Sequence, residues 1–284
     1  MWTAVWAEGC RTLRWSGGFL VRRVRSDAVR ALAVLAFATM ARASFGQGGP
    51  PLITDDPDTP GPGYWEINIS FFREHSHADR LSEVPRLDLN YGLGRRIQLK
   101  LEGPWLVRKE PGMPSVSGLG NTTAGVKWRL RGEEGQKFAW SVYPQYEFHL
   151  SDSSVRKGLV DRGQALFLPT ELTLEVHPME MNIEVGRNFV SGGRPDEWLY
   201  GLAAEAEVGH GLELLGELHG ETPDGGATEL ILNGGGRYKV TRRVTLMLAI
   251  GHAIAGSEQE RPRLLVYAGV QLNLPDTFKF RKSP

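Results

Sequence analysis

The stretch PLITDDPDTPGPGYWEINISFF, residues 51–72, changes character near its middle. Its first half is acidic and rich in Pro and Gly, which disfavour both helix and sheet. From Trp65 onward, apolar and polar residues alternate strictly, with Ile67, Ile69 and Phe71 on the apolar side. Because such alternation indicates a strand with one apolar and one polar face, the stretch predicts an irregular segment that leads directly into a β-strand.

Alternation with a period of two recurs along the rest of the chain, while no stretch after residue 43 has sustained helical periodicity. Twelve stretches show the pattern, near residues 64–73, 84–93, 96–107, 119–130, 137–150, 165–177, 180–190, 197–208, 211–220, 228–239, 243–254 and 262–274. Most of them are longer than the strands of soluble sheets, which usually have about 5–6 residues. Their length is close to the 9–11 or so residues that a tilted strand needs to cross a bilayer.

The connections between these stretches alternate between short and long. Short ones such as residues 94–96 and 209–211 follow every second strand, and longer polar ones such as residues 151–164 follow the others. Short periplasmic turns and longer external loops are typical of outer-membrane barrels with an even number of strands. A soluble β-sandwich gives no reason for this asymmetry.

Aromatic residues fall near both ends of the predicted strands, as they do at the two interfaces of a membrane, although they also close the cores of soluble sheets. They are Trp65, Tyr91, Trp128, Trp140 and Tyr238 at turn ends, and Trp105, Phe189 and Trp198 at loop ends. In hydrocarbon only helices and closed sheets satisfy their backbone polar groups. We therefore predict an all-β fold, a transmembrane antiparallel up-and-down β-barrel of about twelve strands, with its apolar face outside and its polar face around the lumen.

The first 43 residues have the features of a secretory signal. Arg22, Arg23, Arg25 and Arg30 precede the apolar run at residues 31–40, and Ala41-Arg42-Ala43 follows it. We expect cleavage after Ala43, so that residues 1–43 are a signal peptide with an over-long N-region; an uncleaved anchor is the alternative. The remaining chain is predicted to comprise a flexible acidic segment (44–63), the barrel (64–274) and a C-terminal tail (275–284).

Cysteine content and charge narrow the possible functions of the predicted mature chain. The single cysteine, Cys10, lies in the signal region, so the mature chain has no disulfide framework and no thiolate metal site. Without residues 1–43, 26 basic and 31 acidic residues remain, a formal charge of −5. A chain with this net negative charge lacks the basic surface that nucleic-acid-binding proteins use, so we expect no nucleic-acid partner. We expect the cell outer membrane as the location, its lipid as a partner, and no cofactor.

The last predicted strand contains YAGVQLNL, from Tyr267 to Leu274. Its spacing of polar, glycine and apolar positions resembles the C-terminal signal that the outer-membrane assembly machinery reads. That machinery is therefore an expected partner, although a tail of ten residues follows the signal here.

Three motifs, PLITDDPDTPGPGYWEIN, LDLNYGL and GLGNTTAGVKWRL, resemble the bacterial outer-membrane proteins of the MetA-pathway of phenol degradation family. The resemblance runs from about residue 52 to residue 274 and is densest at Thr54-Asp55-Asp56, Gly63, Trp65, Asn90-Tyr91-Gly92 and residues 120–127. Members more often carry Asp at the position of Asn121. The resemblance implies an outer-membrane β-barrel that transports aromatic or other small hydrophobic compounds.

Asp55, Asp56 and Asp58 form the densest acidic cluster. Carboxylates at this spacing can bind Ca²⁺, but the further ligands of a calcium loop are missing, and we predict no metal site. We expect instead that the N-terminal segment reaches into the periplasmic mouth as a plug, where its carboxylates meet lumen cations. The candidate cations are Arg86, Lys100, Lys127, Arg129, Arg237 and Lys239.

The inward-facing charges are segregated along the chain. Basic residues dominate the second to fourth and the tenth predicted strands, while the fifth to ninth carry Glu147, Glu171, Glu175, Glu184, Glu205, Glu207, Glu213 and Glu217. Opposed charged walls can orient a solute or set ion selectivity, or they can pair and fill the lumen. Because twelve strands lie between small filled barrels and large open ones, both interpretations stay open.

His149-Leu150-Ser151 resembles the catalytic pair of outer-membrane phospholipases and lipid A deacylases, since imidazole beside a hydroxyl can activate a serine. No neighbouring sequence resembles those enzymes, and we predict no catalytic residues. The expected function is a channel or uptake protein for small, aromatic or hydrophobic, solutes by passive diffusion. The alternative is a non-conducting structural or adhesion barrel whose external loops, above all residues 151–164, bind partners.

Overall fold

A computed structural model describes residues 49–133, 136–258 and 261–275. The predicted signal peptide, Cys10 and nearly all of the predicted C-terminal tail lie outside the described residues. Pro275, predicted as the first residue of that tail, is instead the last residue of the final strand.

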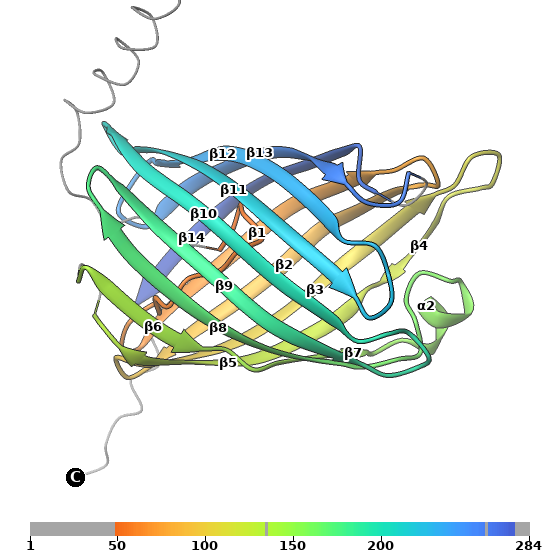
Figure 1. The fold of residues 1–284 in the computed structure, drawn as a ribbon, viewed down its shortest axis with the longest axis horizontal. Coiled ribbons are helices and arrows are strands. Elements are labelled where there is room, and N and C mark those ends of the chain that lie inside the picture. Colours follow the sequence, from red (N-terminus) through yellow and green to blue (C-terminus); the bar gives the residue numbers. More distant parts are fainter. Residues whose placement is uncertain (1–48, 134–135, 259–260, 276–284) are drawn as a thin grey trace, which may run out of the picture. The chain divides into compact units, whose positions relative to one another are not determined.

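The described chain consists almost entirely of antiparallel strands, with one short helix, α2 (Asp152–Arg156) (Figure 1). The strands are β1 (Tyr64–His75), β2 (Arg80–Leu93), β3 (Ile97–Lys109), β4 (Val116–Leu119), β5 (Asn121–Arg131), β6 (Phe138–Val142), β7 (Gln145–His149), β8 (Ala165–Val176), β9 (Met179–Val190), β10 (Glu197–Gly209), β11 (Leu212–Pro223), β12 (Glu229–Lys239), β13 (Val244–Ala255) and β14 (Leu264–Pro275). The one described helix is too short to cross a membrane.

These segments make twelve wall strands, which confirms the predicted number. β4 and β5 both pair with β3, while β6 and β7 both pair with β5 and with β8, so each of these two couples is one interrupted strand. The second interruption falls at Tyr143 and Pro144, where proline has no N–H to donate to a ladder. The predicted start of the second strand at residue 84 was wrong, because a register shift between Glu83 and Arg86 interrupts the alternation and β2 begins at Arg80.

The sheet closes on itself. β1 pairs with β14 along its full length, from Tyr64 opposite Pro275 to His75 opposite Leu264. Because β3 also pairs with β5, and β7 with β8, the antiparallel pairing continues around the whole sheet, which is a closed barrel.

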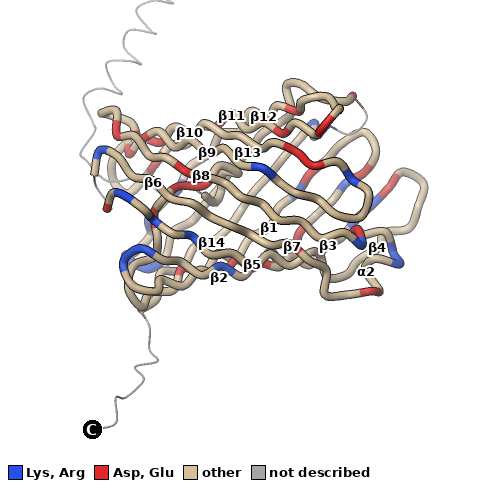
Figure 2. The backbone as a smooth tube through the Cα atoms, turned by 60° about the horizontal axis from the view of Figure 1, so that its bottom comes forward, with Lys and Arg blue, Asp and Glu red and all other residues tan. Residues whose placement is uncertain are grey.

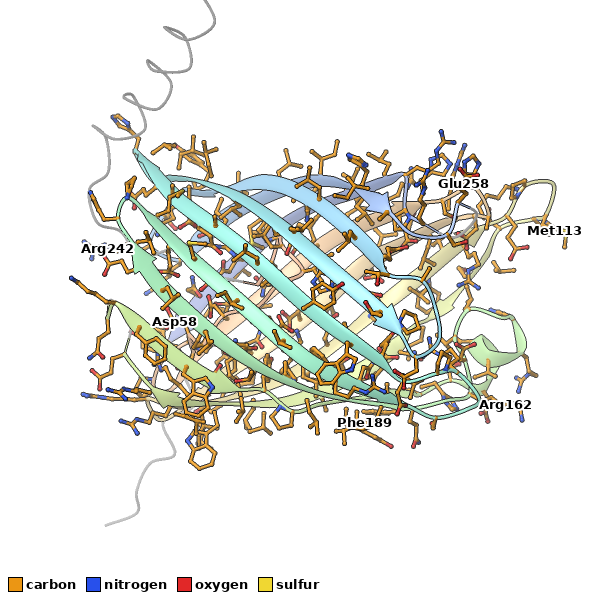
Figure 3. The ribbon with its side chains drawn as sticks, in the orientation of Figure 1. Asp58, Met113, Arg162, Phe189, Arg242 and Glu258 are labelled. Atoms are coloured by element: carbon orange, nitrogen blue, oxygen red, sulfur yellow. The ribbon has the colours of Figure 1, made fainter. Side chains whose placement is uncertain are left out.

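The outer surface is apolar and the interior polar, as predicted. Leu248 and Ile250 on β13 are each 61% exposed, whereas Lys127 on β5 is 1% and Glu171 on β8 is 0% exposed. Figure 3 shows side chains projecting outward along the whole length of the wall. A surface of this kind is stable in lipid, because its apolar side chains contact acyl chains while all the backbone bonds lie within the closed sheet.

The two ends of the barrel differ, also as predicted. Short turns such as 177–178 and 210–211 gather at one end, and the longer loops gather at the other, including residues 150–164 with α2 (Figure 1). Aromatic side chains on the outer surface mark both ends: Trp128, Trp140 and Tyr238 near the turns and Trp105, Phe189 and Trp198 near the loops. We refer to the first end as periplasmic and to the second as external, following the general rule for outer-membrane barrels.

A charge on the lipid-facing wall tests this arrangement. Ile250→Arg, near the middle of β13, is expected to destabilise the folded protein by about 2–4 kcal/mol, because arginine is costly at the bilayer midplane. The measurement is equilibrium unfolding in lipid vesicles. Val240→Arg is the control, since this equally apolar residue is half exposed in the turn between β12 and β13 and its replacement costs at most about 1 kcal/mol. Equal stability of the two variants would contradict a lipid-facing position for Ile250.

Candidate functional site

Residues 49–63, here called the inner segment, lie inside the barrel. Thr54 and Asp56 are buried, and Leu52 packs against Ala203 and Leu215, two small or apolar residues of the polar inner wall. The segment contains five prolines, so it cannot join the sheet as a strand, and fewer of its backbone groups need acceptors. It therefore crosses the lumen as an irregular chain held by side chains of the wall.

Two wall glycines make room for this segment. A Cβ atom at Gly92 on β2 would lie 1.8 Å from the Gly61 carbonyl oxygen, and one at Gly201 on β10 would lie 2.1 Å from Thr54 Oγ1. Any other residue at either position would collide with the inner segment. The wall is therefore shaped to the segment at two points on different strands.

The acidic side of the wall accepts hydrogen bonds from the backbone of the inner segment. Glu217 on β11 accepts from the N–H groups of Ile53 (2.8 Å) and Thr54 (2.8 Å), and Glu184 on β9 accepts from that of Asp55 (2.7 Å). A carboxylate that accepts a backbone hydrogen bond replaces the water that an irregular chain otherwise needs. These glutamates thus fix the path of the segment.

The basic residues of β5 hold the carboxylates of the segment. Lys127 Nζ lies 3.0 Å from Asp55 Oδ1, donates to the Asp56 carbonyl oxygen, and lies 3.5 Å from Glu171 Oε2 on β8. Its ammonium group also sits 4.7 Å from the centre of the Tyr143 ring, a cation–π distance. Lys127 is therefore the central cation between the segment and the wall.

Two arginines anchor the ends of the segment. Arg129 donates to Asp58 Oδ1 (2.8 Å) and to the carbonyl oxygen of Arg95 in the adjoining periplasmic turn (2.7 Å). Arg237 on β12 donates to the carbonyl oxygens of Gly49 and Pro50, both at 3.0 Å. Arg237 is itself held by wall carboxylates, with Nη1 2.8 Å from Glu205 and 3.3 Å from Glu213.

Ionisation differs between the two adjacent aspartates. Burial acts to raise the pKa of Asp55, but the ammonium groups of Lys127 and Lys100 outweigh it and hold that pKa below its usual value. Burial raises the pKa of Asp56, because the attraction of Lys127 does not offset burial and the neighbouring charge of Asp55. Lys127 thus lowers the pKa of both aspartates, but only for Asp55 does this attraction, together with that of Lys100, exceed the effect of burial.

Adjoining cavities lie along the lumen between the described residues. The inner chamber has a volume of about 430 Å³, the outer vestibule about 320 Å³, and a narrow gap beside the inner segment about 30 Å³. The chamber shares Arg86 and Glu102 with the vestibule, and it shares Asp55, Asp88 and Lys100, among others, with the gap. The cavities thus adjoin in series, and the gap beside the segment has room for only about one or two water molecules.

The other predicted lumen residues occupy three levels. Lys100 pairs with Glu102 (2.8 Å) and Asp88 (3.5 Å), and Arg86 pairs with Glu102 (2.6 Å) and Glu83 (3.3 Å), all of them wall residues. Glu147 accepts from Asn121 Nδ2 (2.7 Å) in the vestibule. Glu175 and Lys239 lie at the periplasmic ends of β8 and β12, beside the turns.

The sequence pattern contained residues of the lumen that we did not select. Asp88 and Glu102 have the inward parity and bind the cations that we expected near the inner segment. Tyr143 is fully buried and accepts a hydrogen bond from Gln98 (3.2 Å), but it falls at the interruption between β6 and β7, where alternation gives no signal. Parity alone could have found the two acids.

The His149 and Ser151 side chains make other contacts. Ser151 Oγ lies 2.8 Å from Ser153 Oγ, and His149 Nε2 lies 3.9 Å from the exposed carboxylate of Asp152. Across the described residues, no three His, Cys, Asp or Glu side chains are grouped as metal ligands. Asp55 and Asp58 face Lys127 and Arg129, which occupy the place that a cation would take.

The closed barrel, its apolar exterior and its polar lumen define the chain as a β-barrel of the outer-membrane type. Solved structures share this fold. The COG4313 outer membrane channel from Pseudomonas putida F1 has 13% identity and a TM-score of 0.62, over 80% of this chain and 100% of that one. The KdgM porin in complex with disordered oligogalacturonate has 10% identity and a TM-score of 0.51, over 72% of this chain and 98% of that one.

The NanC porin also shares the fold, with 9% identity and a TM-score of 0.51, over 73% of this chain and 100% of that one. No family model matches the sequence, and a search of curated proteins gives no match. The likeness therefore establishes the outer-membrane barrel fold, while the MetA-pathway family is not confirmed and stays a resemblance.

Removing the central cation tests the contacts of the inner segment. Lys127→Met is expected to destabilise the protein by about 3–5 kcal/mol, because it leaves buried carboxylates without their charge partner. Equilibrium unfolding in lipid vesicles measures the loss. Lys239→Met is the matched control, since Lys239 is exposed at the end of β12 and its removal is expected to have little effect. A Lys127→Met variant as stable as the control would contradict the contacts described.

Proposed function

We propose that the protein is an outer-membrane channel for small solutes and that the inner segment sets the width of its lumen. The observation that carries the proposal is the series of cavities from the external vestibule to the gap beside Asp55. The chamber is of the size that small-molecule sites usually have, and only the gap is too narrow for a solute. A modest displacement of the inner segment widens that gap.

The attachment of the segment suits such a displacement. It is held by ion pairs and hydrogen bonds with wall side chains, such as those of Lys127 and Arg129, which donate, and of Glu217, which accepts, and not by a strand ladder. When the segment shifts, water can take over these polar contacts. The segment is thus a plug that can shift, while the closed wall stays intact.

The proposed solutes are small molecules that are aromatic or hydrophobic, and they cross by passive diffusion. Two considerations support this class: the resemblance of the sequence to the MetA-pathway family, and the apolar side chains of Phe72, Leu265 and Tyr267 that line the chamber. Barrels with the same fold include proteins described as channels and porins.

A structural or adhesion barrel is the alternative, with residues 151–164 as the binding loop. This loop is packed against the barrel: Ser154 and Leu159 are buried, and Lys157 Nζ donates to the Ser117 carbonyl oxygen (2.8 Å). A loop that lies over the mouth in this way suits a vestibule better than a projecting adhesion surface. The conductance experiment below distinguishes the two functions.

Freeing the inner segment tests the channel. In planar bilayers, the double substitution Asp55→Ala and Asp56→Ala is expected to raise single-channel conductance and current noise, because Lys127 loses its partners in the segment. Deletion of residues 49–62 is expected to raise the conductance several-fold. The control pair Glu110→Ala and Asp152→Ala removes the same charge from exposed external loops and should leave the conductance unchanged. Absence of current in the deletion variant favours the structural barrel, and unchanged conductance and noise contradict the plug.

A further inference from the structure

The inner chamber is lined by more acids than bases. Its basic lining residues are Arg86 and Lys100, and its acidic lining residues are Asp55, Glu74, Asp88, Glu102, Glu221 and Glu229. Each of the two cations already binds carboxylates of the wall, Arg86 at Glu102 and Lys100 at both Glu102 and Asp88. The positive groups of the chamber are therefore engaged, and the net charge of its lining is negative.

Acceptors dominate what the chamber offers to a ligand. Glu221 on β11 lies directly opposite Glu229 on β12 in the sheet register, and Glu221 Oε1 also lies 3.5 Å from His219 Nε2. Glu74 on β1 lines the same cavity. These carboxylates attract a positive group that enters the chamber.

Asn233 gives a second, independent indication. Its side chain is only 7% exposed and lines the chamber, and its Nδ2 already donates to Glu217 Oε1 (2.9 Å). Its Oδ1 atom is a buried acceptor without a hydrogen-bond partner in the described part of the chain. A buried acceptor without a hydrogen bond destabilises the folded protein. A ligand that donates a hydrogen bond to this atom would therefore bind favourably here.

Apolar side chains complete the chamber beside these acceptors. Ile231 and Leu265 belong to one buried cluster and Tyr267 to another, and Phe72 packs against both. All four residues line the cavity. An aromatic ring or short alkyl body fits this wall, and the faces of Phe72 and Tyr267 also attract a nearby cation.

We infer that the inner chamber binds an organic cation with an apolar body, such as a protonated aromatic amine. The ammonium group lies among Glu74, Glu221 and the Asn233 Oδ1 atom, and the ring lies against Phe72 and Tyr267. An anion is disfavoured, because it must either approach these carboxylates or displace them from Arg86 and Lys100. The inference rests on the proposed channel, since the ligand reaches the chamber through the lumen, and it adds a charge to the solute class proposed above.

Three ligands of the same shape test the inference: phenethylamine, 2-phenylethanol and phenylacetate. Isothermal titration calorimetry of the purified protein in detergent, at neutral pH, measures their binding. We expect the amine to bind at least about tenfold more tightly than the alcohol, the equivalent of one favourable charge contact, and phenylacetate to bind most weakly. Equal affinities, or a preference for phenylacetate, overturn the inference without any variant.

Isosteric variants locate the site. The double substitution Glu74→Gln and Glu221→Gln is expected to remove most of the preference for the amine over the alcohol. Glu110→Gln, in an external loop away from the chamber, should keep it. Retention of the full preference by the double variant overturns the assignment to this chamber.

The same ligands in planar bilayers separate this inference from the proposed function. If the channel conducts, phenethylamine at the external side is expected to reduce the current more than 2-phenylethanol does. If the protein binds the amine in solution but carries no current even without its inner segment, the proposed channel function is wrong and the binding site is supported. If the channel conducts but shows no preference for the amine, the channel function is supported and the binding site is wrong.

Discussion

A strand in hydrocarbon must find a partner inside the protein for every backbone N–H and C=O group. The ladder between β1 and β14 meets this requirement at the last open edge, with twelve residue pairs from Tyr64–Pro275 to His75–Leu264. Once the sheet is closed, its outer face can be as apolar as lipid, and the polar residues are confined to one enclosed volume. The lumen, its charges and the inner segment all depend on that closure.

The inner segment faces the same requirement without the help of a ladder. Its prolines lower the number of N–H groups, and Glu184 and Glu217 accept from three of those that remain. On the other side, Lys127 and Arg129 bind its carboxylates. Acidic residues are concentrated on strands β8–β11, and basic residues on β5 (Figure 2). This distribution matches the inner segment, because its backbone N–H groups donate to the acidic strands and its carboxylates bind the basic residues of β5.

The sequence predicts the number and position of the strands, and it predicts that the apolar face lies outside and the polar face inside. It does so because alternation is a local property of each strand. Contacts across the lumen are not local. The same parity that directs Lys127 and Arg129 inward also directs Lys100 inward, yet Lys100 binds Asp88 and Glu102 on its own and the adjacent strand. Which cation meets the inner segment depends on the register of strands and on the path of residues 49–63. Tyr143 was missed for a different reason, since the break in β6 and β7 removes the pattern itself.

The position of the inner segment also determines which charges a solute meets. While the segment is in place, it covers Lys127, Arg129 and Arg237 with its own acceptors. The exposed lining is then that of the acidic chamber, which in the proposed channel attracts cations. Once the segment moves away, these three basic residues lose those acceptors, and carboxylates such as Glu217 lose their backbone donors. In the proposed channel, ion selectivity is thereby coupled to the position of the inner segment, because a change in the width of the lumen also changes the charge that faces it.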